Sequence, residues 1–208
     1  MRIIHQDEDI VVVEKPSGFL SVPGRGEDKI DSVSHRIRTT IAGCIDQPSV
    51  HRLDMDTSGL IVLALTKEAH RNLSMQFQER QTEKHYVALL DGELDGDEGT
   101  ITLPFRLDVD NRPYQIYDEV HGKIGTTHWQ KVAIENGLTR VAFHPITGRT
   151  HQIRIHAAHE KGLGIPILDD PLYGNGSDPG KMKLHAASLA FDHPASGERL
   201  SFKTPPPF

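Results

Sequence analysis

The sequence predicts an α+β fold in which short strands outnumber helices. A continuously apolar and partly β-branched run at Gly59 to Leu65 is typical of a strand buried on both faces. The segment Lys67 to Gln81 carries apolar side chains four residues apart, which predicts an amphipathic helix; these are Ala69, Leu73 and Phe77. Turn residues separate the other strand patterns of the chain.

The remaining elements follow from local patterns along the chain. Residues Arg2 to Glu14 predict two short strands broken at Gln6 to Asp9, and the Gly-rich and charged stretch Phe19 to Ile30 predicts a loop. Asp31 is placed to cap a helix that runs to about Ile41. A turn and then a helix are expected over Gly148 to Glu160. Further strands are expected near Lys84 to Leu90, Thr100 to Leu103, Gln115 to Glu119, Thr126 to Ile134, Thr139 to His144, Leu184 to Phe191 and Arg199 to Phe202.

Length and composition predict one globular domain over residues 1 to 208. The chain is 37% apolar and 25% charged, which is ordinary for a globular protein, and it has no internal repeat and no low-complexity linker. No apolar run approaches the roughly 18 residues of a membrane helix, and the N-terminus lacks the pattern of a signal peptide. We therefore expect a cytoplasmic protein. The single cysteine, Cys44, excludes an intrachain disulfide.

The net charge of −6 does not exclude a nucleic-acid partner. Five acidic residues lie in the short segment Asp91 to Glu98, which we expect to be a hairpin or an exposed loop, and without them the balance is −1. What matters for RNA binding is whether a positive face can form. Candidate groups, some of which are ordinary surface charges, are Arg25 with Lys29, Arg36 with Arg38, Arg71 with Arg80 and Lys84, Arg106 with Arg112, and Arg149 with Arg154.

Several kinds of chemistry find no support in the sequence. Thirteen histidines suggest metal binding, and His151, His156 and His159 lie close together, but no zinc-ligand spacing is present. Cys44 has no basic neighbour that could activate it as a nucleophile. Residues Gly24 to Gly26 lack the spacing of a dinucleotide-binding loop. Neither metal binding nor the binding of a phosphate-bearing cofactor is therefore supported by a motif.

Three separated segments combine reactive side chains with predicted strands or helices. Arg52 and Asp54 lie on a turn-forming loop directly before the buried strand at Gly59, and Tyr86 lies in the strand pattern KHYVALL. The third segment, ITGRTHQIRIH, contains Arg149, His151, Gln152 and Arg154.

Each of these segments also has an ordinary structural explanation. Arg52 and Asp54 could form a solvated ion pair, Tyr86 could be a half-buried strand residue, and Arg154, taken alone, is expected to be a charge on a helix surface. Together they supply a carboxylate, an aromatic ring and a guanidinium, which could hold and act on a planar base joined to a sugar.

Five motifs in fixed order resemble the pseudouridine synthases of the RluA type. They are DIVVVEKPSGFLSVPG (9 to 24), HRLDMDTSGLIVLALT (51 to 66), KHYVAL (84 to 89), PITGRTHQIRIH (145 to 156) and LHAASLAFDHP (184 to 194). The resemblance covers nearly the whole chain. It implies a mixed, mainly antiparallel sheet flanked by helices and loops, with a central active-site cleft, and an isomerase that modifies structured RNA without a cofactor.

The resemblance also implies roles for single residues. Asp54 matches the catalytic aspartate of the family, Tyr86 the tyrosine that stacks on the target uracil, and Arg154 the arginine that pairs with the aspartate. Arg52 matches the residue that fills the gap left by the flipped nucleotide. Further RNA contacts are expected from Arg25, Arg149, His151 and Gln152. Asp56, an additional acid beside the motif, should face away from RNA.

The FLSVPGR loop and the lack of an N-terminal RNA-binding extension resemble the short family members that modify 23S ribosomal RNA and a transfer RNA anticodon stem-loop. We expect a monomer with no membrane partner. Three alternatives stay open: a synthase specific for transfer RNA, a non-catalytic RNA-binding or chaperone protein on the same scaffold, and a metal-dependent hydrolase that uses the histidines.

Overall fold

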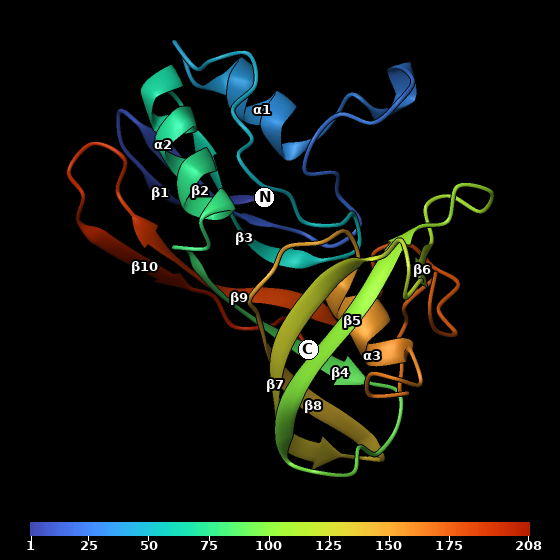
Figure 1. Cartoon of the computed structure of the whole chain (residues 1–208). Coiled ribbons are helices and arrows are strands. Elements are labelled where there is room, and N and C mark those ends of the chain that lie inside the picture. Colours follow the sequence, from blue (N-terminus) through green and yellow to red (C-terminus); the bar gives the residue numbers. More distant parts are fainter. The chain divides into compact units, whose positions relative to one another are not determined.

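The computed structural model describes residues 1 to 208 and divides them into two compact units. The first unit contains residues 1 to 84 and 185 to 207, and the second contains residues 85 to 184 and residue 208. Figure 1 labels their helices and strands. Both points of division lie within continuous strands rather than in linkers. The amino-acid composition therefore does not change there.

The first unit is built on strands that pair in the order β1, β2, β3, β9, β10. Strands β2 and β3 pair antiparallel over their whole length, and every residue of β3 is buried, as its apolar sequence predicts. Strand β3 pairs parallel with β9, and the remaining pairs of this unit are antiparallel. The bounds are β1 Arg2–Gln6, β2 Ile10–Lys15, β3 Ser58–Ala64, β9 Leu184–Asp192 and β10 Arg199–Lys203.

Two helices and one 3₁₀ turn complete the first unit: α1 (Val33–Thr40), α2 (Lys67–Gln78) and η1 (Glu27–Lys29). Helix α2 packs Ala69 and Leu73 against apolar residues of β2, β3 and β9, which confirms the predicted amphipathic face. It ends three residues before the predicted Gln81.

The predicted helix cap at Asp31 is wrong. The side chain of Ser32 caps α1 by accepting a hydrogen bond from the N–H of His35, and the Asp31 carboxylate instead makes a bidentate pair with Arg36. A capping residue must directly precede the first helical residue. The first helical residue of α1 is Val33, so the capping position is Ser32.

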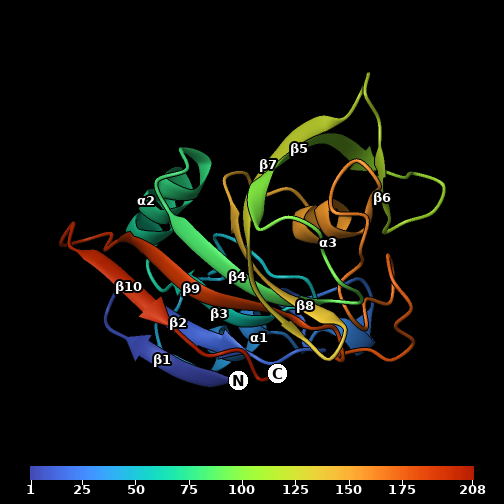
Figure 2. The same ribbon diagram turned by 90° about the horizontal axis from the view of Figure 1, so that it is seen from below.

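The second unit is an antiparallel sheet with the strand order β4, β8, β7, β5, β6. The expected strands are all present, and β5 and β7 are longer than predicted. Helix α3 covers one face of this sheet (Figure 2), with Ile153 and Ala157 packed against Phe143. The bounds are β4 Glu83–Leu90, β5 Glu98–Leu107, β6 Gln115–Tyr117, β7 Lys123–Glu135, β8 Leu138–Pro145 and α3 Gln152–Ala158.

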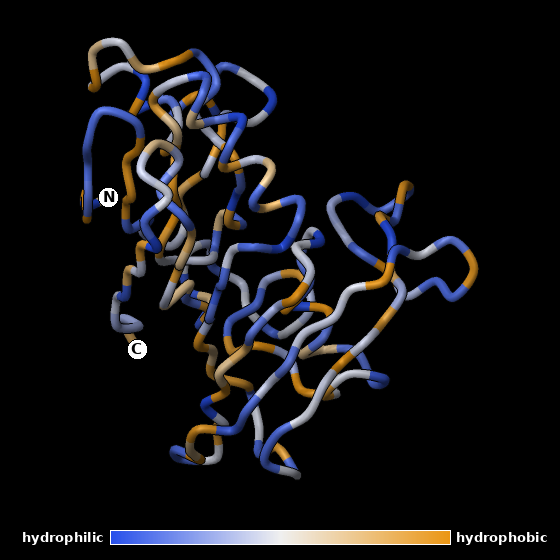
Figure 3. The backbone as a smooth tube through the Cα atoms, turned by 60° about the vertical axis from the view of Figure 1, so that its left-hand side comes forward, coloured by the Kyte–Doolittle hydropathy of each residue, from blue (hydrophilic) through white to orange (hydrophobic).

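The predicted α+β class with a mixed, mainly antiparallel sheet is confirmed. Burial alternates from one residue to the next along β8, which lets one face of the sheet pack on α3 while the other meets solvent. Figure 3 shows the apolar (orange) and polar (blue) stretches along the backbone. No helix is both long enough and apolar enough to cross a membrane. The predicted central cleft stays a prediction.

One prediction of the sequence fails at α3. Arg154, expected on the helix surface when taken alone, is only 2% exposed. All residues from Gln152 to Ala157 are buried, polar and apolar alike. A one-sided amphipathic pattern therefore could not show which polar residue points inward.

Burial of a neutral histidine makes the fold sensitive to acid. Desolvation, with a smaller contribution from Lys84, lowers the pKa of His51 from 6.5 to about 3, and its Nε2 accepts a hydrogen bond from the N–H of Val62 at 3.0 Å. The unfolded chain binds this proton more tightly than the folded chain does. The stability contributed by His51 is therefore present above pH 6.5 and is lost as the pH falls towards 3.

Chemical denaturation between pH 7 and pH 4 tests this expectation. We expect His51→Gln, which keeps an acceptor for Val62, to lose less unfolding free energy between pH 7 and pH 4 than the parent protein does. The exposed control His121→Gln should show the same pH dependence of the unfolding free energy as the parent. Equal slopes for all three proteins would show that His51 does not carry the effect.

Candidate active site

Asp54 lies in the first unit, on the loop that leads into β3. Its side chain is half-buried, and the turn is closed by a hydrogen bond from the N–H of Thr57 to the carbonyl of Asp54 at 3.1 Å. The buried strand follows directly at Ser58. The structure thus places this carboxylate as the sequence predicts, on a loop fixed by a rigid strand.

The end of β2 supplies the main support of this loop. Lys15 is fully buried, and its ammonium donates to three backbone carbonyls: Pro16 at 3.0 Å, Phe19 at 2.7 Å and Met55 at 2.8 Å. Desolvation lowers the pKa of Lys15 from 10.5 to about 7, and the nearby carboxylates of Asp56 and Asp54 oppose that shift. The bond to Met55 joins β2 to the residue directly after Asp54.

Two serines that follow Lys15 hold the same loop. The Ser21 hydroxyl donates to the carbonyl of Leu53 at 2.7 Å and accepts from the N–H of Leu53 at 3.0 Å. The Ser17 hydroxyl donates to the carbonyl of Asp56 at 2.5 Å. The backbone of residues 53, 55 and 56 is therefore bonded to residues 15 to 21, which limits how far the Asp54 backbone can move.

The strand behind the loop is fixed by a close backbone contact. Gly59 has φ +112°, and a Cβ atom there would come within 2.3 Å of the Ala186 carbonyl on β9. Beside it, the Ser58 hydroxyl lies 2.8 Å from Nδ1 of His185, whose Nε2 lies 3.0 Å from Oγ1 of Thr204. Glycine at position 59 thus allows the parallel pairing that anchors the loop.

The structure places the other predicted residues of the first unit in different environments. Asp56 is buried, and its charge acts on Lys15; that it faces away from RNA stays a prediction. Arg52 and Arg25 are exposed, as RNA-binding side chains would be, and their RNA contacts stay predictions. Among the other candidate cations of this unit, Arg36 pairs with Asp31 and Arg38 with Asp46.

Tyr86 lies in the second unit, on β4 directly opposite Phe143 of β8. The ring is half-buried and packs against the apolar cluster beneath α3. This packing explains why an aromatic residue suits the strand, and it fixes the direction of the ring. Its stacking on a uracil stays a prediction.

Arg154 forms a buried, bidentate ion pair with Asp170. Its Nε donates to Oδ2 at 2.8 Å and its Nη2 to Oδ1 at 2.6 Å, and both side chains are almost fully inaccessible. Asp170 Oδ1 also accepts from the N–H groups of Leu172 and Tyr173, while the guanidinium carbon lies 5.3 Å from the centre of the Tyr173 ring. The guanidinium is thereby held in one plane.

The guanidinium of Arg154 donates to the Asp170 carboxylate from two of its nitrogens. Asp54 belongs to the first unit and Arg154 to the second, so their pairing stays a prediction.

The segment before α3 is held by Gln152. Its Oε1 accepts from the Thr147 hydroxyl and the Arg149 N–H, and its Nε2 donates to the Thr126 carbonyl and the Thr127 hydroxyl. These four bonds use the whole amide, and the side chain is 4% exposed. The structure therefore gives Gln152 a positioning role, and its direct RNA contact stays a prediction.

Arg149 and His151, which both precede Gln152 in the chain, differ in exposure. Arg149 is exposed, with Nε 3.4 Å from the Ile124 carbonyl. His151 is buried with a left-handed backbone (φ 55°), and its Nδ1 lies 2.9 Å from the Tyr173 hydroxyl, which also accepts from the N–H of Gln115. Tyr173 thus links His151 to the loop of Asp170.

Sequence reasoning missed Lys15, Ser21, Asp170 and Tyr173. A lysine at the end of the apolar run of β2 was a usable signal for a buried cation, although the sequence there predicts only a turn. Asp169 and Asp170 are adjacent, and no pattern distinguished the buried acid from its half-buried neighbour.

One group of carboxylates and a histidine could approach a metal ion: Asp7, Asp9 and His193. The Asp7 carboxylate already accepts from the N–H groups of Asp9 and Ile10 and contacts His5 and His193. These internal bonds account for the arrangement.

Burial raises the pKa of the Cys44 thiol, which disfavours the thiolate, as expected for a cysteine without a catalytic role.

Comparison with known proteins identifies one family. Residues 9–159 match the family model described as RNA pseudouridylate synthase. The chain is 45% identical to the "Dual-specificity RNA pseudouridine synthase RluA" of Pasteurella multocida, with 100% of this chain and 94% of the relative covered. It is likewise 45% identical to the protein of that name from Escherichia coli, with 99% and 93% covered.

A solved structure agrees with this result. "Human RNA Pseudouridylate Synthase Domain Containing 1" superposes with a TM-score of 0.79 at 28% identity, covering 100% of this chain and 84% of that one. The human domain-containing protein 4 of the same series, at 23% identity and a TM-score of 0.76, has the same fold. This chain therefore belongs to the RNA pseudouridylate synthases, isomerases that convert uridine in RNA to pseudouridine.

Proposed function

We propose that this enzyme has dual specificity and modifies uridines in both 23S ribosomal RNA and a transfer RNA anticodon stem-loop, in the cytoplasm. The observation that carries the proposal is the near-complete coverage, at 45% identity, of relatives named dual-specificity synthases. A synthase restricted to transfer RNA is the alternative. The two compact units would act together as one catalytic domain, as a monomer and without a metal or an organic cofactor in the reaction.

Asp54 is the proposed catalytic carboxylate. It would act on the ribose of a uridine turned out of its stack, either by attacking C1′ or by removing a C2′ proton, while the bond between N1 and C1′ breaks. The freed uracil would turn and form a bond from C5 to C1′, which releases the Asp54 carboxylate in the first case and is accompanied by return of the proton to C2′ in the second. The proton lost from C5 is balanced by the proton gained at N1, so the reaction needs no other reactant. The hydrogen bonds from Lys15, Ser17 and Ser21 support this role, because a fixed backbone holds the carboxylate in position.

Other residues would bind the RNA and orient the reacting groups. Tyr86 would hold the uracil ring during its rotation, and Arg154 would keep the Asp54 carboxylate ionised and oriented. Arg52 would fill the space vacated by the flipped nucleotide. Exposed Arg25 and Arg149 would contact phosphates, and His151 would contribute a further RNA contact. A non-catalytic RNA-binding protein would gain nothing from a carboxylate fixed so firmly near RNA.

Pseudouridine mapping of total RNA tests the dual specificity and the role of Asp54 together. Cells that lack the enzyme should lose pseudouridine from one site in 23S ribosomal RNA and from transfer RNA anticodon stem-loops. The parent gene should restore both, and Asp54→Asn should restore neither although the protein still binds RNA. Loss from transfer RNA alone would support the narrower specificity, and restoration by Asp54→Asn would exclude Asp54 as the catalytic carboxylate.

A second prediction concerns Asp170 as a positioning residue. Asp170→Asn leaves the buried Arg154 without its counter-charge, which should lower stability by about 3–5 kcal/mol and the turnover number by at least roughly tenfold. The Michaelis constant should change less, because Asp170 is not expected to touch RNA.

The matched control is Asp31→Asn, which breaks an exposed Arg–Asp pair of the same bidentate geometry. We expect it to leave both stability and turnover close to those of the parent, because solvent screens an exposed pair. A folded Asp170→Asn protein with parental turnover would refute the positioning role.

A further inference from the structure

A hollow of about 480 Å³ lies beside β6 and α3 of the second unit, outside the proposed catalytic set. Its volume is within the range of pockets that hold small molecules. Strand β6 runs beside α3 (Figure 2), and most of the side chains that line the hollow are apolar or aromatic. Gln115 and Tyr117 come from β6, Ile155 and Ala158 from α3, and His159 and Tyr173 from the segment after the helix.

Gln115 brings a polar group without an internal partner to this hollow. It lies two residues from Tyr117 on β6, so both side chains project from the same face, on which Tyr117 packs against the cluster of Ile155. Gln115 is 9% exposed, and its side-chain amide makes no hydrogen bond with another residue, although its backbone N–H donates to Tyr173. A buried amide without a partner destabilises a fold, so a ligand that pairs with it accounts for its presence.

The rings that line the hollow can stack on a flat ligand. The rings of Tyr117 and His159 have centroids 5.2 Å apart at an interplanar angle of 33°, and the Tyr117 hydroxyl donates to Glu119 at 3.1 Å, which holds the ring. The ammonium of the exposed Lys161 lies 5.4 Å from the centre of the Tyr117 ring. Unpaired RNA bases are bound by such sets, in which a ring stacks on the base, a polar side chain pairs with its edge and a cation meets the phosphate.

The same lining disfavours other small ligands. It contains one histidine and no carboxylate, so a metal ion would lack ligands, and a phosphate group alone would meet only the lysine beside Tyr117. A glutamine amide carries an N–H donor and a carbonyl acceptor side by side, which matches the donor and acceptor atoms on the edge of a nucleobase. The chemistry of the hollow therefore favours a nucleobase.

We propose that this hollow binds one unpaired base of the substrate RNA other than the target uridine. The base edge pairs with the Gln115 amide, its face stacks on Tyr117, and its phosphate lies near Lys161. The inference rests on the proposed function in that it needs an RNA substrate, but it holds whichever RNA the enzyme modifies.

Steady-state kinetics with an RNA that the parent enzyme modifies tests the role of Gln115. We expect Gln115→Leu to raise the Michaelis constant for RNA roughly tenfold and to change the turnover number less than about twofold, because a base bound away from the reacting atoms contributes equally before and during the reaction. The melting temperature should stay the same or rise, because an apolar side chain replaces a buried amide without a partner. A glutamine with a purely structural role would lower it.

Removal of single bases from the RNA identifies the occupant. In the parent, an abasic nucleotide at one position outside the target uridine should raise the Michaelis constant about as much as Gln115→Leu does. The two changes together should add little to either alone, because both remove the same contact. Tight calorimetric binding of free AMP, CMP, GMP or UMP, with no effect of Gln115→Leu on RNA, would instead place a free nucleotide in the hollow and overturn the proposal.

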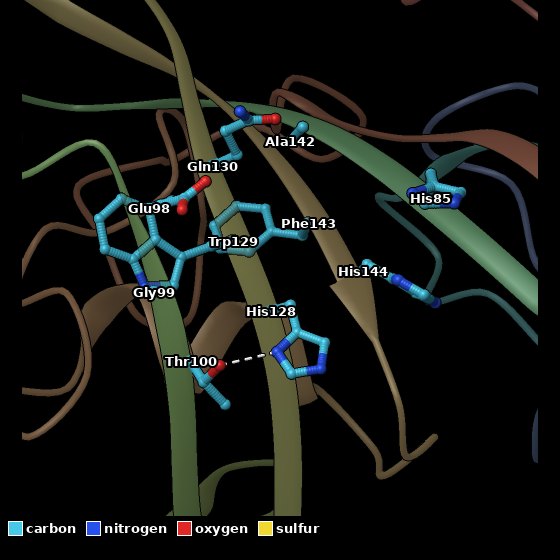
Figure 4. Close-up of a pocket in the computed structure, with 10 residues that line it drawn as sticks. All are labelled: His85, Glu98, Gly99, Thr100, His128, Trp129, Gln130, Ala142, Phe143 and His144. Atoms are coloured by element: carbon cyan, nitrogen blue, oxygen red, sulfur yellow. Dashed lines mark hydrogen bonds between the residues drawn. The ribbon is translucent and has the colours of Figure 1, made fainter.

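The matched control is Gln130→Leu. Gln130 lines another hollow of the second unit, on the open face of the sheet (Figure 4), but it is exposed, so water can pair with its amide. This variant should keep the parental Michaelis constant. A parental Michaelis constant in folded Gln115→Leu, an equal rise in Gln130→Leu, or additivity of Gln115→Leu with every abasic substitution would each overturn the assignment. Failure of the dual specificity would leave these outcomes unchanged, since they are measured on whichever RNA is modified.

Discussion

The buried ammonium of Lys15 is the interaction on which the proposed active site depends. A cation inside a protein is costly unless oxygen atoms surround it, and here three backbone carbonyls do so. One of them belongs to Met55, beside Asp54, so the end of β2 and the catalytic loop stabilise each other. Neither segment can move without leaving a buried charge or a buried carbonyl unsatisfied. The serines at 17 and 21 extend the same connection to the neighbouring residues of the loop.

The second unit also relies on a buried charged group, but there the supporting group is a carboxylate. Arg154 is buried against Asp170, and Asp170 is in turn fixed by two backbone N–H groups. Such pairs contribute little net stability, but breaking one is expensive, so the guanidinium keeps its orientation. In each unit, a buried ionic contact supports a side chain proposed for catalysis. This arrangement provides preorganisation, since groups held in place before the substrate arrives need not be ordered during the reaction.

The sequence predicted the helices and strands better than it predicted the contacts that hold them. The buried strand β3 and the helix α2 follow from unbroken apolar patterns, and Asp54 follows from five ordered motifs. The burial of Arg154, the cap at Ser32 and the division into two units could not be predicted, because each depends on residues distant in the chain or on a choice between similar neighbours.

Hydrogen exchange at the catalytic loop tests the role of Lys15 most directly. In Lys15→Met, the amides of Leu53 and Thr57, bonded to Ser21 and to the Asp54 carbonyl, should exchange at least roughly tenfold faster, because the opening of the loop becomes easier. Amides of β7 and β8 should be unaffected, as should all of these amides in Lys67→Met, which removes an exposed lysine. Parental exchange at Leu53 and Thr57 in a folded Lys15→Met protein would contradict the account.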